Sequence, residues 1–196
     1  DEIKNIYGLV DGSQEELETI QKYLKPSKSK LLLWDDANEN NIKNINLNNF
    51  KIIHFATHGE LAGTIKGQNE PFLVLTPPKI GTNENDGLLT MSEIMNLENN
   101  AELVILSACN TAGGNIKQSE GFSGLARAFL FSGSKSVLVS NWYVETYAAM
   151  ELTTGMIKQI KDNPKISTSK ALSGSMKNFV SNNKEKSHPF YWAPFV

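Results

Sequence analysis

Two short apolar runs place the strongest constraint on what this chain can fold into. They cover residues 51–56 and 103–108, and each has β-branched residues at its centre. Neither run alternates with polar residues, which is typical of strands buried on both faces of a parallel sheet. The two runs therefore predict the core of an α/β domain.

A reactive side chain follows each run. His58 and then Gly59 follow the first, and Cys109 follows the second. In open α/β sheets, functional sites form in the crevice beyond the carboxyl ends of the strands. A thiol and an imidazole delivered there suggest a cysteine nucleophile with its histidine base. We therefore predict that His58 and Cys109 form a catalytic dyad, provided that the two strands are neighbours.

The chemistry of such a pair also needs hydrogen-bond donors for the oxyanion. A free thiol has a pKa of about 8.5, so a nearby imidazole is needed to raise the thiolate fraction at neutral pH. The thiolate attacks a carbonyl, the histidine protonates the leaving amine, and water then cleaves the acyl-enzyme. The backbone N–H groups of Gly59 and Cys109 are the donors that we expect.

Other interpretations of these residues remain open. A lone cysteine is often a buried small hydrophobe. His54 and His58 are four residues apart, a spacing that favours metal binding on a helix but not across a strand and its exit. We therefore expect no metal site, and we expect His54 to be a hydrogen-bonded core residue. Gly113, Gly114 and Gly121 precede a helix but match no phosphate-binding motif, and we expect no cofactor.

Strands and helices alternate along the chain, which predicts a mostly parallel sheet. The expected strands are residues 30–34, 51–56, 72–75, 103–108 and 136–140, and residues 192–196 are a candidate edge strand. The expected helices are residues 13–24, 38–47, 90–97, 121–131, 145–161 and 167–180. Capping boxes are expected at Ser13 with Glu16 and at Thr90 with Glu93, and Gly133 is expected to end a helix.

Size and charge narrow the class of protein. A chain of 196 residues is expected to form one domain, residues 1–196. The net charge of −2 predicts no direct binding to nucleic acid, and no apolar stretch is long enough to cross a membrane. The sequence has no signal peptide and a single cysteine, so we expect a cytoplasmic location.

Six blocks of sequence are spread in order over nearly the whole chain. The first block is His54-Phe55-Ala56-Thr57-His58-Gly59. The other blocks are residues 86–94, 103–111, 120–130, 136–142 and 188–195. Together these blocks resemble the CHAT domain family, a caspase-like peptidase module often found with tetratricopeptide repeats.

The resemblance implies a caspase-like three-layer sandwich around a central, mostly parallel sheet of roughly six strands. It also implies a cysteine endopeptidase with His58 and Cys109 as the dyad and Gly59 as an oxyanion donor. The substrate would be a protein or peptide. A partner domain or ligand would regulate the activity, with tetratricopeptide repeats as the expected partner, and the upstream repeat region is expected to be absent from this chain.

The resemblance also points to residues around the pocket for P1, the substrate residue whose carbonyl is attacked. Ser107 stands two residues before the cysteine, where caspase-like folds line this pocket. The stretch after the next strand adds Asn141, Trp142 and Glu145. The carboxylate of Glu145 would favour a basic P1 residue, unless it simply occupies a helix start.

Two further functions stay open as alternatives. A catalytically silent caspase-like interaction module would keep the fold without turnover. A nucleotide or acyl-transfer enzyme would rest on the glycines that precede the helix. Intact His58, Gly59 and Cys109 favour the peptidase over both.

Overall fold

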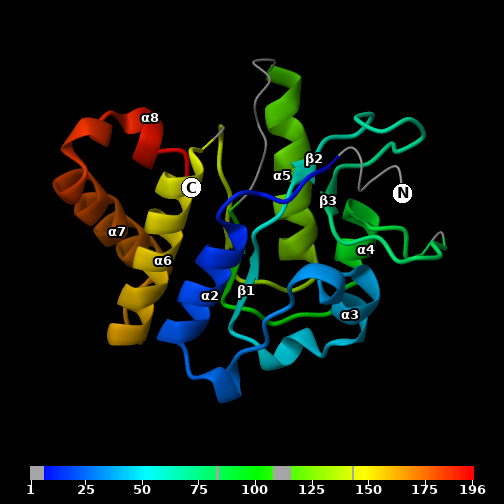
Figure 1. Cartoon of the computed structure of the whole chain (residues 1–196), viewed down its shortest axis with the longest axis horizontal. Coiled ribbons are helices and arrows are strands. Elements are labelled where there is room, and N and C mark those ends of the chain that lie inside the picture. Colours follow the sequence, from blue (N-terminus) through cyan, green and yellow to red (C-terminus); the bar gives the residue numbers. More distant parts are fainter. Residues whose placement is uncertain (1–6, 83, 108–115, 143) are drawn as a thin grey trace.

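The computed structural model describes residues 7–82, 84–107, 116–142 and 144–196, and it places helices on both sides of a parallel sheet (Figure 1). The strands are β1 (Ile52–Phe55), β2 (Gly59–Glu60), β3 (Phe72–Val74), β4 (Leu88–Thr90), β5 (Leu103–Leu106) and β6 (Val137–Leu138). The α-helices are α2 (Ser13–Tyr23), α3 (Glu39–Asn44), α4 (Met91–Met95), α5 (Ile116–Phe131), α6 (Thr146–Asp162), α7 (Thr168–Asn182) and α8 (Pro189–Trp192).

The two apolar runs form neighbouring parallel strands, as predicted. The parallel sheet has the order β1-β5-β6. Ile52 pairs with Leu103 at the start of β1 and β5, and Phe55 pairs with Leu106 at their ends. The carboxyl ends of the two strands therefore meet at the same edge of the sheet.

Both faces of this sheet are covered by helices, which explains why the strands lack polar alternation. Alternate residues along β1 and β5 face opposite layers, because successive side chains of a strand point to opposite faces. One cluster joins Leu103, Ile105 and Leu138 to Ile20 of α2, Leu152 of α6 and Phe179 of α7. The other joins Phe55, Val104 and Leu106 to Ile94 of α4 and Phe129 of α5.

A single mostly parallel sheet of about six strands is not what the structure contains. Among the described residues, the strands divide into the parallel sheet β1-β5-β6 and a separate antiparallel sheet, β2-β3-β4. The predicted strand at residues 72–75 is present as β3, but it pairs antiparallel to β2 and β4. The loop between β2 and β3 contains no helix to make a parallel crossover, and antiparallel strands need only a short link.

Residues 30–34 do not form a strand, contrary to the sequence prediction. They form an irregular segment that ends in a 3₁₀ helix, Trp34–Asp36, and Trp34 has a positive φ of 54°. An apolar run shows that side chains are sheltered but not that the backbone is paired in a sheet. Here Leu32 and Leu33 line a cavity close to His58 instead of packing in the parallel sheet.

The two predicted capping boxes differ in outcome. Thr90 and Glu93 form the expected reciprocal capping box at the start of α4. Ser13 is instead the first residue of α2, and Gly12 is the N-cap without a side-chain hydrogen bond. A Cβ atom on Gly12 would lie 2.7 Å from Cγ2 of Thr146, so close packing against α6 favours glycine there.

The last three residues of the chain pair with the segment after β6, within the predicted edge segment 192–196, whereas Trp192 belongs to α8. Val139 and Val196 exchange backbone hydrogen bonds of 3.1 and 3.0 Å, and Ser140 forms an antiparallel bridge with Phe195. This segment continues the sheet just beyond β6. Pro194 is tolerated at such an edge because one side of the segment needs no ladder partner.

Helix α5 ends as predicted at a glycine. The Ser134 N–H bonds the Phe129 carbonyl and the Gly133 N–H bonds the Leu130 carbonyl, which is the Schellman arrangement. Gly133 has a φ of 116°, and a Cβ atom there would lie 2.1 Å from the carbonyl oxygen of Asn99. This close approach joins the end of α5 to the loop that leads into β5.

We expect Gly133→Ala to lower the free energy of unfolding by about 2 kcal/mol or more, because it adds a backbone clash to an unfavourable φ. Gly63→Ala is the matched control, since Gly63 has a φ of 82° but no atom within 4 Å of the added Cβ. It should cost only about 1 kcal/mol. Urea denaturation measures both, and equal losses would rule out the clash with Asn99.

Candidate active site

His58 lies just beyond the carboxyl end of β1, and a backbone carbonyl determines its tautomer. Its Nε2 atom is 2.9 Å from the carbonyl oxygen of Gly8. A carbonyl can only accept a hydrogen bond, so Nε2 must donate. The neutral imidazole therefore carries its proton on Nε2, and Nδ1 is the nitrogen that can act as a base.

Two further groups surround this imidazole. The ring of Tyr7 lies 5.6 Å from the His58 ring, measured between centroids. Burial raises the pKa of Glu60 above its ordinary value, while attraction to His58 opposes that rise. The Glu60 carboxylate is thus close enough to stabilise a positively charged imidazolium when one forms.

Gly59 begins β2 and pairs with Leu73 of β3. The ladder hydrogen bond next to this pair runs from the Val74 N–H to the His58 carbonyl, at 2.8 Å. In an antiparallel ladder this makes Gly59 and Leu73 a pair that does not exchange hydrogen bonds. The Gly59 N–H therefore points away from β3 and is not used in the pairing with that strand.

Cys109 lies outside the described residues, as do Gly113 and Gly114. The described part of this strand reaches Ser107, whose N–H donates to the Phe55 carbonyl at 3.1 Å. The pairing of β1 with β5 thus continues at least one residue beyond the end of β5. Ser107 itself is 4% exposed, and its hydroxyl faces the interior.

Next to Ser107 lies a buried polar network that joins the sheet to α2 and α6, two helices that cover the same face of it. His54 Nε2 is 2.9 Å from Ser107 Oγ and 3.1 Å from an oxygen of Glu16 on α2. The Thr153 hydroxyl of α6 donates to the same Glu16 oxygen at 2.7 Å. His54 is therefore a hydrogen-bonded core residue, as predicted, although no described residue offers its Nδ1 a hydrogen bond.

The charge of Glu16 is stabilised by these contacts. Burial by itself raises the pKa of Glu16, but attraction to His54 and hydrogen bonds from its neighbours outweigh burial. The pKa of this carboxyl therefore lies below its ordinary value, so Glu16 is ionised at neutral pH. An ionised carboxylate in the core is costly unless it is paired and hydrogen-bonded, as it is here.

The other predicted pocket residues lie between β6 and α6. The backbone N–H of Asn141 bonds the Pro194 carbonyl at 2.8 Å, and the indole N–H of Trp142 donates to the Phe190 carbonyl at 3.0 Å. Glu145 is the N-cap of α6, without a side-chain cap hydrogen bond. Both of its carboxylate oxygens bond Lys186, at 2.6 and 2.8 Å.

Comparison with known proteins assigns the chain to a family. A sequence model of the CHAT domain matches residues 4–196. The chain belongs to the CHAT domain family. This family is related to caspase-like peptidases, so the likeness seen in the six sequence blocks is confirmed at the level of the family.

Curated relatives of this CHAT domain are tetratricopeptide repeat proteins. Tetratricopeptide repeat protein 28 of Mus musculus is 28% identical over 171 residues, which cover 74% of this chain and 7% of that protein. The Homo sapiens protein of the same name is 26% identical over 171 residues, with the same coverage. The chain thus spans about 7% of the length of these relatives.

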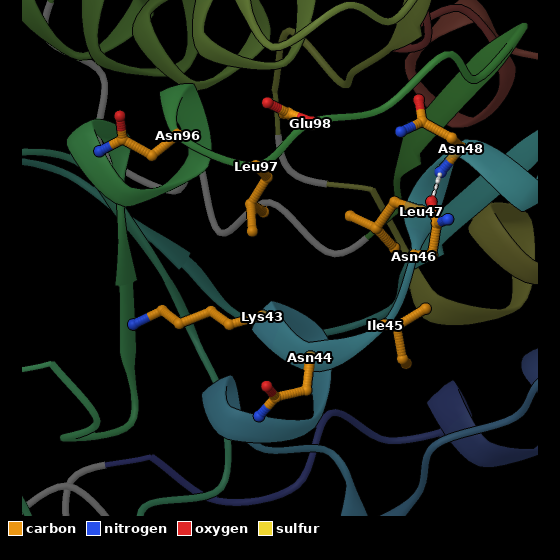
Figure 2. Close-up of a pocket in the computed structure, with 9 residues that line it drawn as sticks. All are labelled: Lys43, Asn44, Ile45, Asn46, Leu47, Asn48, Asn96, Leu97 and Glu98. Carbon is orange, nitrogen blue, oxygen red and sulfur yellow. Dashed lines mark hydrogen bonds between the residues drawn. The ribbon is translucent and has the colours of Figure 1, made fainter.

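Two cavities of this CHAT domain lie near opposite ends of the parallel strands. One, of about 620 Å³, includes His58 and the segments around residues 7–14, 32–37 and 74–77. The other, of about 430 Å³, lies near the amino ends of β1 and β5, where Leu47 and Leu97 point toward each other (Figure 2). Its Lys43 bonds Glu39 and Glu93 and extends away from these leucines (Figure 2).

Within the described ranges, no three histidine, cysteine, aspartate or glutamate side chains gather as a metal site would require. None of the helices seen there has both the length and the apolar character to span a bilayer.

Sequence reasoning missed three contributors to this site: Gly8, Glu16 and Thr153. The sequence predicts Glu16 as a partner in a capping box, whereas its side chain faces the core. Its spacing does indicate burial, because Glu16 stands four residues before the buried Ile20 and thus on the same face of α2. No local pattern distinguishes Gly8 or Thr153, because their roles depend on contacts with distant segments.

We expect Glu16→Gln to lower the free energy of unfolding at pH 7 by about 2 kcal/mol or more, because it removes the charge that His54 stabilises. The pKa of Glu16 is lower in the folded than in the unfolded protein. Its contribution to the free energy of unfolding is therefore complete above the ordinary carboxyl pKa of about 4.3 and is lost as the pH falls through the pKa in the folded state. The difference between wild type and variant should therefore shrink below about pH 4.

Urea denaturation at several pH values checks this behaviour. Glu15→Gln is the matched control, since Glu15 is exposed in the same first turn of α2. It should change stability little at any pH. A Glu16→Gln effect that stayed constant down to pH 3 would show that the carboxylate charge is not what stabilises the network.

Proposed function

We propose that this CHAT domain is a cysteine endopeptidase that uses His58 and Cys109. The observation that carries the proposal is the parallel pairing of β1 with β5. Phe55 and Leu106 are paired, and His58 and Cys109 each stand three residues further along their chain segments. Residues equally far beyond a paired position in parallel strands are expected to approach one another at the sheet edge.

The tautomer of His58 supports the role of a general base. Because Gly8 holds the proton on Nε2, Nδ1 takes the proton from the thiol. The thiolate attacks the scissile carbonyl, the C–N bond breaks as the imidazolium gives its proton to the leaving amine, and water hydrolyses the thioester. Glu60 lies where its charge favours the imidazolium in this cycle.

Two backbone N–H groups are proposed to stabilise the oxyanion of the tetrahedral intermediate. One belongs to Gly59, whose N–H points away from β3, and the other belongs to Cys109. A preorganised backbone donor of this kind typically contributes about 3–4 kcal/mol to lowering the barrier. The chemistry needs no metal and no organic cofactor.

The P1 pocket is proposed to include Ser107, Asn141, Trp142 and Glu145. Ser107 is small and engaged with His54, so it contributes a short, neutral wall. The charge of Glu145 is compensated by Lys186. Charge complementarity with Glu145 alone therefore does not favour a basic P1 residue in the wild-type protein.

Regulation by tetratricopeptide repeats is part of the same proposal. The curated relatives carry such repeats in their names, and this chain corresponds to a small part of their length. A repeat array presents an extended surface that suits the binding of a protein or peptide. We further propose a cytoplasmic location, because a reducing compartment keeps a thiol nucleophile active.

The dyad is tested by a reaction that needs no knowledge of the substrate. Because the chain has one cysteine, alkylation by iodoacetamide reports on Cys109 alone. We expect His58→Ala to slow alkylation at pH 7 several-fold or more, and to lower peptide hydrolysis about 10²–10⁴-fold. Cys109→Ala should abolish hydrolysis without changing the thermal unfolding midpoint by more than a few degrees.

A fluorogenic library varied at P1 provides the substrates, with mass spectrometry to follow alkylation. Equal hydrolysis by wild type and Cys109→Ala would refute the thiol mechanism. Unchanged alkylation in His58→Ala would assign the base to another residue. Binding of peptides with no turnover by the chain, with or without tetratricopeptide repeats, would support the silent interaction module instead.

The pocket assignment predicts a change in P1 preference for Lys186→Met. Removing the lysine leaves the Glu145 carboxylate uncompensated, so turnover of basic P1 residues should rise about two- to fivefold relative to leucine. Lys184→Met is the matched control, because Lys184 lies in the same 3₁₀ helix and is exposed. An unchanged preference in Lys186→Met would remove Glu145 from the pocket.

A further inference from the structure

The cavity of about 620 Å³ beside His58 has a mainly apolar lining. Its apolar residues come from the N-terminal segment, from the irregular segment before α3 and from the end of β3. They include Leu9, Leu33, Trp34, Val74, Leu75 and Pro77. A hollow of this size that shares a wall with a candidate general base is suited to hold part of a substrate.

The rim of this cavity exposes large apolar side chains. Trp34 is 54% exposed and Leu9 is 68% exposed, and they come from separate segments of the chain. Apolar side chains that converge on a hollow from separate segments are typical of a binding surface rather than of isolated surface residues. Among the described residues, an apolar surface is therefore exposed at the cavity that His58 lines.

The backbone at Trp34 is held in an unusual conformation. Its φ of 54° is unfavourable for a bulky residue. The Trp34 carbonyl accepts hydrogen bonds from the Thr76 hydroxyl at 2.7 Å and from the Ala37 N–H at 3.0 Å. Such strain persists only where neighbouring contacts enforce it, and here it presents the indole at the rim of the cavity.

The chemistry of His58 indicates which part of a substrate reaches this cavity. The imidazole must give its proton to the nitrogen of the leaving amine. The substrate residues that depart with this amine therefore pass on the His58 side of the scissile bond. A cavity that has His58 in its wall lies on the path of these residues.

We propose that this cavity binds a large apolar side chain from the first two substrate residues on the leaving-amine side. The inference rests on the peptidase function proposed above. Leu9 and Trp34 supply apolar contact at the rim, and the end of β3 supplies the inner wall. Leucine or phenylalanine in the substrate buries its side chain there.

The charged residues of the cavity add a second element of specificity. The carboxylate side chains in its lining are those of Asp11 and Asp35. Both are acidic, so they repel an aspartate or glutamate in the departing segment. The cavity thus selects for apolar residues and against acidic residues at the same positions.

Two kinds of substrate test this inference. Internally quenched peptides share one acyl-side sequence and carry leucine, phenylalanine, glycine or aspartate in the two leaving-side positions. A coumarin amide of the same acyl-side sequence has no leaving-side residue and reports on the dyad alone. We expect kcat/KM for leucine or phenylalanine to exceed that for glycine about tenfold, with aspartate lowest.

Trp34→Ala should lower the ratio of kcat/KM for the leucine peptide to that for the coumarin amide about tenfold. Trp34→Gly also removes the indole, and glycine adopts the positive φ at this position without steric cost. Phe131→Ala is the matched control, because Phe131 is an aromatic residue that is 73% exposed at the end of α5, outside this cavity. It should leave both rates unchanged.

The outcomes separate the cavity from the peptidase function. Cleavage of the coumarin amide with equal rates for the leucine, glycine and aspartate peptides would overturn the cavity assignment and leave the peptidase intact. A leucine preference that both Trp34 variants retained would also overturn it. A third outcome combines two results: neither kind of substrate is cleaved, and Cys109 is no more reactive in wild type than in His58→Ala. This outcome would overturn the peptidase function and, with it, the leaving-side assignment of the cavity.

Discussion

The parallel pairing of β1 with β5 is the interaction on which the rest of this molecule depends. β5 is fully buried and β1 is partly buried, and helices pack against both faces of the pair. The pairing of Phe55 with Leu106 sets the position from which the chain continues to His58 on one side and toward Cys109 on the other. A shift in this register would move the segments that follow β1 and β5 relative to each other and would separate the two residues of the proposed dyad.

A buried polar network lies next to Ser107 at that end of the sheet. Glu16 of α2 contacts His54 of β1 and accepts a hydrogen bond from Thr153 of α6, and His54 in turn contacts Ser107. Burying these groups opposes folding unless each finds a partner, so the network requires the helices to sit at one definite position on the sheet. It therefore positions the carboxyl end of β5, where Ser107 lies, while contributing less to stability than apolar packing of the same volume.

The imidazole of His58 depends on segments far from it in sequence. Gly8 selects its tautomer, and the segments around Trp34 and Thr76 build the cavity beside it. The strained backbone of Trp34 is enforced by hydrogen bonds from Thr76 and Ala37, which is how folded proteins hold unfavourable conformations near functional sites. A site built in this way combines a rigid sheet edge with irregular segments that shape the approach of a substrate.

Local sequence patterns were enough to predict strands β1 and β5, the capped start of α4, the glycine that ends α5, the pairing of the last residues with the sheet and the membership of the CHAT family. These features follow from local hydrophobic patterns, caps and motifs, which are written in neighbouring residues. Other features became visible only in the folded chain: residues 32–34 line a cavity, β2, β3 and β4 form their own antiparallel sheet, Lys186 compensates Glu145, and Glu16 faces His54. Each of these depends on which distant segments meet, because hydrogen bonding and charge compensation act through space and leave no regular spacing along the chain.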